Sequence, residues 1–344
     1  MGDAGTHDGQ QGMADRTARE ELHPTVMIYS PCPVLTVTIE RHREVPELHL
    51  HAGGQGVWQA RMLTNLGARP VLCTTLGGEV GRVLSSLLAA ESFDVRAVPS
   101  AMSSGWYVHD RFEGERREIA GHPGGPLDRH ELDELSNVAL TEGLRTDISI
   151  FAGPTHPSLV PPSTYRRLAA DLRSNGARVV ADLAGDHLSA AVAGGLTFLK
   201  VAHDELVAAG RARDESLEQL RMAARQLRQE GAAAVVVSRA ELPAIAIFEE
   251  MDVMVEVPKM EQADPRGAGD SMTAAVAAML GQGATVADAV RVGAGAGAAN
   301  VTRHGLGTVH APAVVELAKR VKLVALPDVD EQTSLPYGQM EEGR

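Results

Sequence analysis

A short stretch near the C-terminal end of the chain combines the residue types that phosphate chemistry requires. Residues 264–271 read Asp-Pro-Arg-Gly-Ala-Gly-Asp-Ser, and a run of small, helix-forming residues follows over 272–280. The small side chains of Gly267, Ala268 and Gly269 leave their backbone N–H groups uncovered, and the expected helix points its positive end at the same place. The stretch therefore predicts an anion hole that can hold a phosphate.

Asp270 lies on the first turn of that expected helix, where its carboxylate would compete with a bound anion. A general base beside a phosphate cradle explains such a placement, because phosphoryl transfer needs alignment, charge neutralisation and a late proton acceptor. In this interpretation Asp270 accepts the proton of the attacking hydroxyl, while the N–H groups stabilise the charge on the transferring group. The alternative is that Asp270 and Ser271 only cap a helix.

The pattern extends beyond this core. An acid, a proline and a variable residue precede Gly-Ala-Gly-Asp, and three variable residues separate it from Ala-Ala-Val-Ala at 274–277. The whole pattern resembles the C-terminal signature of the ribokinase-like carbohydrate kinases, also called the PfkB family. Other matching segments follow in the family's order, at residues 36–39, 53–56, 124–126, Tyr165 and Asp182. The resemblance covers roughly residues 25–312 and is closest to the 1-phosphofructokinase and tagatose-6-phosphate kinase branch.

The resemblance implies an α/β fold, a three-layer α/β/α sandwich with a mostly parallel central sheet and a small β-strand lid. It also implies transfer of the γ-phosphate of ATP to a hydroxyl of a sugar or sugar phosphate. Because ATP brings several negative charges beside Asp270, Mg²⁺ is expected as the offsetting cation. Two alternatives stay open: a nucleoside kinase, and a catalytically weak binding or regulatory member of the family.

Composition and the order of expected elements agree with one large α/β unit. The chain has 344 residues, 44% of them apolar, a formal net charge of −13 and two cysteines, Cys32 and Cys73. The acidic balance without a basic stripe argues against nucleic acid as a partner. The two cysteines have no metal-ligand spacing and are expected to be buried thiols in a reducing cytoplasm. We expect neither a membrane span nor a recognisable secretion signal.

Repeated strand and helix patterns over residues 25–325 predict the kinase domain, between a disordered tail at 1–24 and a flexible tail at 326–344. Residues 25–29 and 34–39 are expected to form one first strand with a break at the prolines between them. Exposed strands near 40–52 and 103–121 do not fit the central sheet and are expected to form the separate lid.

The family's nucleotide-binding pattern falls on residues at several points of the chain. The resemblance assigns this role to Lys200, Glu205, Ser238, Arg266, Gly297 and Asn300, with Glu205 also facing the metal. Gly293, Gly295 and Gly297 lie in a helical pattern, where each glycine costs about 1 kcal/mol relative to alanine. A closely approaching surface must compensate, either the adenine ring or the helix that starts at 271. Asn300 has the alternative of an ordinary helix-end residue.

The family's acceptor-binding pattern falls on Glu44, Gly53, Gly54, Gln55, Trp58 and Trp106, and several of these depart from it. Gln55 replaces a lysine, Trp58 replaces an asparagine, and Trp106 stands near the place of an arginine. Tryptophan offers a flat face for stacking on a sugar or a base, or it packs beneath the lid. The lost cations narrowly favour an uncharged acceptor, unless arginines such as Arg41, Arg43, Arg111 or Arg116 supply the charge from shifted positions.

Two further expectations concern the lid. Its unpaired edges and its apolar positions Leu48, Leu50 and Val108 predict pairing with a second copy, hence a homodimer through the lids. The histidines there are interpreted as solvated side chains rather than metal ligands.

Overall fold

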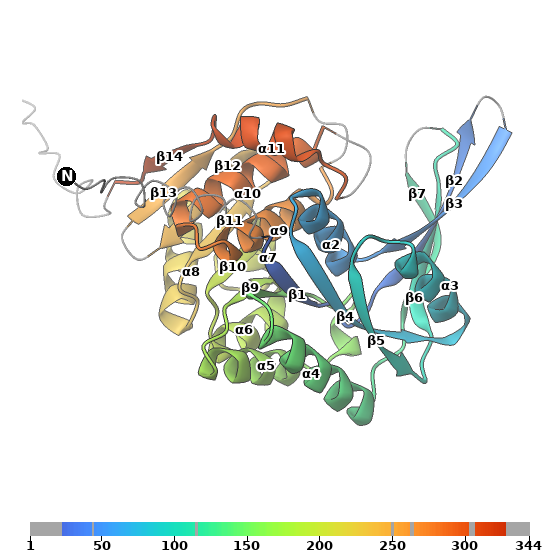
Figure 1. The fold of residues 1–344 in the computed structure, drawn as a ribbon. Helices are drawn as coiled ribbons and strands as arrows, with labels where there is room; N and C mark the ends of the chain where they lie inside the picture. Colours follow the sequence, from blue (N-terminus) through green and yellow to red (C-terminus); the bar gives the residue numbers. More distant parts are fainter. Residues whose placement is uncertain are drawn as a thin grey trace, which may run out of the picture.

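A large twisted sheet with helices on both faces forms the body of the molecule, and a second, smaller sheet projects from one side of it (Figure 1). The computed structural model describes residues 23–42, 45–113, 116–248, 251–261, 265–302 and 307–327. Within these residues the large sheet has ten strands and the small sheet has four. This architecture confirms the predicted ribokinase-like sandwich.

The large sheet runs in the order β14 (Lys322–Ala325), β13 (Met251–Glu256), β12 (Leu242–Phe248), β11 (Val235–Arg239), β10 (Phe198–Ala202), β9 (Val179–Asp182), β8 (Ile148–Ala152), β1 (Thr25–Tyr29), β4 (Arg69–Gly77) and β5 (Asp94–Ser100). The strands from β11 to β5 pair in parallel, whereas β12, β13 and β14 extend the sheet as antiparallel strands. The sequence pattern did not predict this antiparallel edge.

Two hydrophobic cores lie on the two faces of the large sheet. Along β1 the side chains alternate, so Val26 and Ile28 enter one core while Met27 and Tyr29 enter the other. The first core is covered by α2 (Gln55–Asn65), α3 (Gly78–Ala89), α9 (Ala268–Gly281), α10 (Val286–Asn300) and α11 (Ala311–Ala318). The second is covered by α4 (Arg129–Gly143), α5 (Pro162–Ser174), α6 (Gly185–Gly194), α7 (His203–Ala208) and α8 (Leu217–Glu230). A 3₁₀ turn, η1 (Pro157–Leu159), precedes α5.

The small sheet, which we call the lid, runs in the order β3 (Val45–Gly53), β2 (Val34–His42), β6 (Ser104–Asp110) and β7 (Arg117–Gly124). The prediction that 25–29 and 34–39 form one broken strand is therefore wrong, since β1 belongs to the large sheet and β2 to the lid. The physical reason lies in Pro31 and Pro33, which have no N–H for a ladder and turn the chain out of the large sheet.

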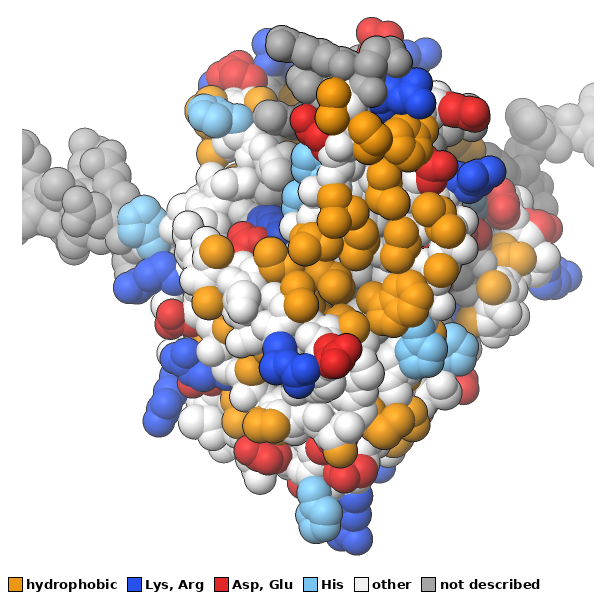
Figure 2. All heavy atoms as spheres, turned by 90° about the vertical axis from the view of Figure 1, so that its right-hand side faces the viewer, with side chains coloured by type: hydrophobic (Ala, Val, Ile, Leu, Met, Phe, Trp, Pro, Cys, Tyr) orange, Lys and Arg blue, Asp and Glu red, His pale blue; other side chains and the backbone are white. Residues whose placement is uncertain are grey.

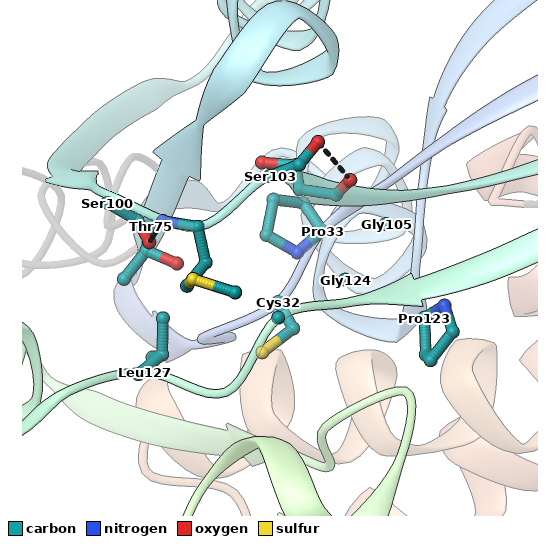
Figure 3. Close-up of a pocket in the computed structure, with 12 residues that line it drawn as sticks. Cys32, Pro33, Thr75, Ser100, Ser103, Gly105, Pro123, Gly124 and Leu127 are labelled. Carbon is teal, nitrogen blue, oxygen red and sulfur yellow. Dashed lines mark hydrogen bonds between the residues drawn. The ribbon is translucent and has the colours of Figure 1, made fainter.

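Figure 3 shows the base of the lid, where this link passes between the chain segments that enter and leave the small sheet. Cys32 and Pro33 lie there beside Ser103, Gly105 and Gly124. The void between them measures about 10 Å³, enough for about one water molecule and too small for a substrate. The base of the lid is thus a packed joint.

Small residues allow the helices on the first face to pack closely. A Cβ on Gly293 would lie 2.7 Å from the Val276 side chain of α9, and a Cβ on Gly295 would lie 2.7 Å from the Ala318 nitrogen of α11. Helix packing therefore accounts for these two glycines of α10, and α9 is held between α10, α2 and the sheet. None of the helices in the described parts of the chain is long and apolar enough to cross a membrane.

Candidate active site

The N-terminus of α9 presents the backbone groups of the expected anion hole. Gly267 is the N-cap with φ 74°, a left-handed conformation that glycine adopts without strain. The helix begins at Ala268, so the N–H groups of Ala268, Gly269 and Asp270 belong to its first turn and lack partners within the helix. The sequence Gly-Ala-Gly thus gives a short turn that exposes N–H donors at the positive end of a helix.

Asn300, at the end of α10, stabilises this turn through two hydrogen bonds of its side chain. Its side-chain nitrogen donates to the Arg266 carbonyl oxygen at 2.7 Å, and the Ser271 hydroxyl donates to its side-chain oxygen at 3.1 Å. Asn300 is fully buried and does not line a pocket that could hold nucleotide. In the structure Asn300 therefore supports the glycine turn through these two hydrogen bonds, and its predicted contact with nucleotide stays a prediction.

An ion pair lies behind the turn. Lys200 of β10 and Asp182 at the end of β9 are register neighbours in parallel strands, and their charged groups are 3.2 Å apart and buried. The Thr273 hydroxyl donates to the second oxygen of Asp182 at 3.3 Å. A Cβ on Gly269 would lie 2.6 Å from the Lys200 ammonium nitrogen, so glycine at 269 lets this cation approach the backbone of the turn. Lys200 adds positive charge directly behind the expected anion hole.

The Asp270 carboxyl has an altered acidity. Burial, followed by the nearby Asp182 carboxylate, raises its pKa to about 7, while Lys200 and a hydrogen bond from Gln55 oppose the rise. The Gln55 side-chain oxygen accepts from the Gly153 N–H at 2.7 Å, which orients its amide nitrogen as the donor to Asp270. Gln55, which replaces a lysine of the family pattern, therefore contacts the Asp270 carboxylate.

A pocket of about 610 Å³ opens on one side of the turn. Ala268 and Gly269 of α9 and Gly297 of α10 line it, together with Ser238 of β11. The rest of the lining is mainly apolar, with Ala244, Met272, Ala298 and Val301 among its residues. The chemistry of this pocket suits a nucleotide. Its apolar part can hold a base, and its part beside the turn offers N–H donors for phosphates.

A second pocket, of about 440 Å³, lies between the lid and the body of the molecule. Gly53, Trp58 and Thr36 contribute to its lining, together with a group of basic side chains: His49, His51, Arg61, Arg111, Arg116 and Arg266. Arg61 is anchored by Glu91 and by the Ala52 carbonyl oxygen. The segment 266–269 borders both pockets, because Arg266 lines this one and Ala268 and Gly269 line the other.

The other residues predicted for the site are spread over several parts of the fold. Trp106 pairs in register with Leu35 and packs against the first core, on the lid face away from the pocket. Arg266, predicted to contact nucleotide, lines the lid-side pocket. Gly54 is the N-cap of α2 with φ 101°. Glu44 lies outside the described residues. The ion pair of Asp182 with Lys200 was not predicted, although Asp182 matched the family pattern and a polar residue that ends a buried strand was a usable signal. The hydrogen bond from Thr273 to Asp182 was not predicted either.

Glu205, the predicted metal ligand, lies on the first turn of α7. Its Oε2 accepts from the Ala202 N–H at 2.8 Å, burial raises its pKa, and it is close enough to Asp270 to affect the acidity of that group. His203, in the same motif, contacts the Ser238 carbonyl oxygen at 3.2 Å. Within the described ranges no cluster of three or more His, Cys, Asp or Glu side chains is arranged to hold a metal ion.

Comparison with known proteins agrees with this geometry. Residues 27–313 match the model of the pfkB family of carbohydrate kinases. The chain is 30% identical to the ATP-dependent 6-phosphofructokinase isozyme 2 of Escherichia coli over 67% of this chain and 75% of that protein. It is 28% identical to the 1-phosphofructokinase of Bacillus subtilis over 66% of this chain and 74% of that protein.

Solved structures give the same result for the fold. A tetrameric inhibited form of Escherichia coli phosphofructokinase-2 superposes with a TM-score of 0.77 and 25% identity, covering 86% of this chain and 99% of that one. Arabidopsis thaliana ribokinase complexed with ribose and ATP superposes with a TM-score of 0.66 and 19% identity, covering 87% and 99%.

A ribokinase-like sandwich, a glycine turn at a helix N-terminus and two pockets that share this turn define a small-molecule kinase. The chain belongs to the pfkB family of carbohydrate kinases, in its 1-phosphofructokinase branch, as the sequence pattern predicted. It is an ATP-using enzyme that transfers phosphate to a sugar hydroxyl.

Proposed function

We propose that this kinase transfers the γ-phosphate of ATP to a sugar that already carries a phosphate group. The observation that supports this most strongly is the arrangement of two pockets around one turn. Besides Arg61, which Glu91 holds, three arginines line the pocket on the lid side: Arg111, Arg116 and Arg266. An arginine fork matches a phosphate in geometry and charge. The proposal replaces the narrow expectation of an uncharged acceptor, which rested on the cations lost at positions 55 and 106.

The proposed general base is Asp270. Its pKa of about 7 lets it hold a proton and release it near neutral pH, as a catalytic base should. It directly follows the segment 266–269, which borders both pockets and near which an acceptor hydroxyl and a transferring phosphate would meet. The proton leaves the hydroxyl for the Asp270 carboxylate as the oxygen–phosphorus bond forms and the bond to the ADP oxygen breaks.

The N–H groups of the turn around Gly267, Ala268 and Gly269 are proposed to stabilise the charge that spreads over the transferring group. Lys200 supports them from behind, since its ammonium lies against Gly269. Burial lowers the pKa of Lys200, but the acidic groups around it raise the pKa by more. The side chain therefore stays a cation. Ser238 and Gly297 are proposed to border the nucleotide.

Magnesium fits this arrangement as the ion that accompanies ATP and offsets the charge of its phosphates. Mg²⁺ prefers oxygen ligands, keeps several waters and binds through one or two carboxylates together with phosphates. Glu205 supplies such a carboxylate, held in place by the Ala202 N–H and close to Asp270. In the proposal Glu205 would hold the ion through its carboxylate, and Asp270 would be left to accept the proton.

The outer face of the lid is proposed to pair with a second copy of the chain. Leu48 and Leu50 alternate along β3 with the pocket histidines and are 63% and 43% exposed on the other face. Figure 2 shows a contiguous apolar patch on this side of the molecule. A patch of this kind marks an interaction site, and the solved Escherichia coli phosphofructokinase-2 described as a tetramer shows that a protein of this fold can assemble.

The test of the proposed acceptor measures ADP release with fructose 1-phosphate, fructose 6-phosphate and tagatose 6-phosphate, and with the corresponding free sugars and nucleosides. We expect kcat/KM to be at least about tenfold higher for one phosphorylated sugar, since a charge-assisted pair contributes roughly 1.5 to 3 kcal/mol. Arg111→Met should remove this preference, while Arg82→Met, an exposed arginine on α3, should keep it. A free sugar or a nucleoside as the best substrate would overturn the proposal.

A further inference from the structure

A buried histidine lies directly behind one of the pocket arginines. His109 of β6 is 6% exposed and pairs in register with Thr38, a residue of the pocket lining, so its side chain points to the same face of the lid. Its Nε2 is in hydrogen-bond contact with the Arg116 guanidinium. Its Nδ1 is buried and has no hydrogen-bond partner among the described residues.

This contact defines the protonation state of His109. A guanidinium only donates, so Nε2 must be the acceptor and the proton of the neutral ring must be on Nδ1. Arg116 thereby has one side of its guanidinium directed at the imidazole while it lines the acceptor pocket beside Arg111 and Arg266. A protonated ring has no acceptor left and would place two cations in contact.

We propose that His109 is a positioning residue for the acceptor phosphate: its neutral imidazole holds Arg116 in the pocket, and protonation of the ring releases Arg116. The inference rests on the proposed function and adds the residue that sets how firmly the acceptor is held. Neither pocket lining includes His109 itself, so its effect on the acceptor passes through Arg116.

The charges around His109 favour the neutral ring at physiological pH. Burial lowers its pKa most, the Arg116 and Arg266 guanidinium groups lower it further, and Glu118, its register partner on β7, raises it. Thr38, opposite it on β2, carries no charge. The net shift is below the ordinary value of 6.5. The hydrogen bond to Arg116 is therefore complete near neutral pH and is lost as the pH falls through this lowered pKa.

The test compares three variants of the full chain for KM of the best phosphorylated acceptor, KM of ATP and kcat between pH 5.5 and 8. His109→Leu removes the acceptor atom, so the acceptor KM should rise about tenfold at every pH, with kcat and the KM of ATP little changed. His109→Gln offers an amide oxygen near the place of Nε2, so it should keep a low KM that no longer rises in acid. His122→Gln, a lid histidine in register with Trp106 and hence on the other face, should retain the wild-type profile.

Binding of the acceptor, followed through the fluorescence of Trp58 in the pocket, gives a second readout that is independent of turnover. Equal KM values for the Leu and Gln variants would refute the role of His109, as would an equal loss of affinity for the unphosphorylated sugar. If the wild-type enzyme turns over only unphosphorylated substrates, the proposed function itself is wrong. If His109→Leu does not fold, the loss of the acid rise in KM in the folded His109→Gln variant decides the matter.

Discussion

The hydrogen bond between Gln55 and Asp270 leads to a quantitative prediction for the pH dependence of catalysis. Gln55 donates to the Asp270 carboxylate and thereby lowers the pKa of that group, which still remains at about 7. A hydrogen bond to a charged group contributes roughly 1.5 to 3 kcal/mol, and one pKa unit corresponds to about 1.4 kcal/mol. Gln55→Leu should therefore raise the pKa of Asp270 by about one to two units.

Because the base must be ionised, a higher pKa moves the acid limb of the pH profile toward alkaline pH. With a pKa of about 7, half of Asp270 is ionised at pH 7; a rise of ~1 unit leaves about a tenth ionised. The variant should thus lose roughly fivefold or more in kcat/KM at pH 7 and recover most of it near pH 9.

The assay is the pH profile of kcat/KM between pH 5.5 and 9.5 under saturating ATP. Gln59→Leu is the matched control, because Gln59 lies one turn further along α2 and is fully buried, without a hydrogen-bond partner for its amide in the described structure. Its acid limb should stay where the wild-type limb lies. An unshifted limb in Gln55→Leu, or an equal shift in both variants, would refute the role assigned to Gln55.

Three further outcomes can be measured on purified protein. Lys200→Met should lower the free energy of unfolding by about 3 to 5 kcal/mol in denaturant titrations, because it leaves Asp182 buried without its cation; a change below 1 kcal/mol would contradict this. Gly295→Ala should cost about 1 to 3 kcal/mol of stability, since its Cβ meets the Ala318 backbone; unchanged stability would show that α10 and α11 separate easily. Leu50→Glu should abolish a dimer seen by light scattering at micromolar concentration, whereas substitution of Met222, an exposed residue of α8, by Glu should not; a monomeric wild-type protein would contradict the lid interface.

The glycine turn at the N-terminus of α9 could be predicted from the sequence because its signals are local. Gly267 and Asp270 lie within four residues of one another, and a glycine turn that begins a helix is recognisable without knowledge of the rest of the fold. The same holds for the sandwich, whose alternating strands and helices are regular along the chain.

The acceptor pocket could not be predicted in the same way, because its residues come from segments far apart in the sequence. Arg111 and Arg116 reach the pocket from the lid, whereas Arg266 reaches it from the catalytic turn. Which face of a lid strand meets the pocket depends on register, and this placed Trp106 on the opposite side from the one considered. Asn300 could not be assigned either, since only the fold shows that it supports the Arg266 carbonyl oxygen.

The central claim is that the Asp270 carboxylate accepts the proton during transfer, and substitution of this group tests it most directly. Asp270→Asn keeps the size of the side chain and removes the base, so single-turnover phosphate transfer should fall by about 10²- to 10⁴-fold while ATP affinity and thermal stability stay near wild type. The control is Asp186→Asn: Asp186 is an exposed aspartate that, like Asp270, lies on the first turn of a helix, and its substitution should leave turnover unchanged. Near wild-type transfer by Asp270→Asn would contradict the account.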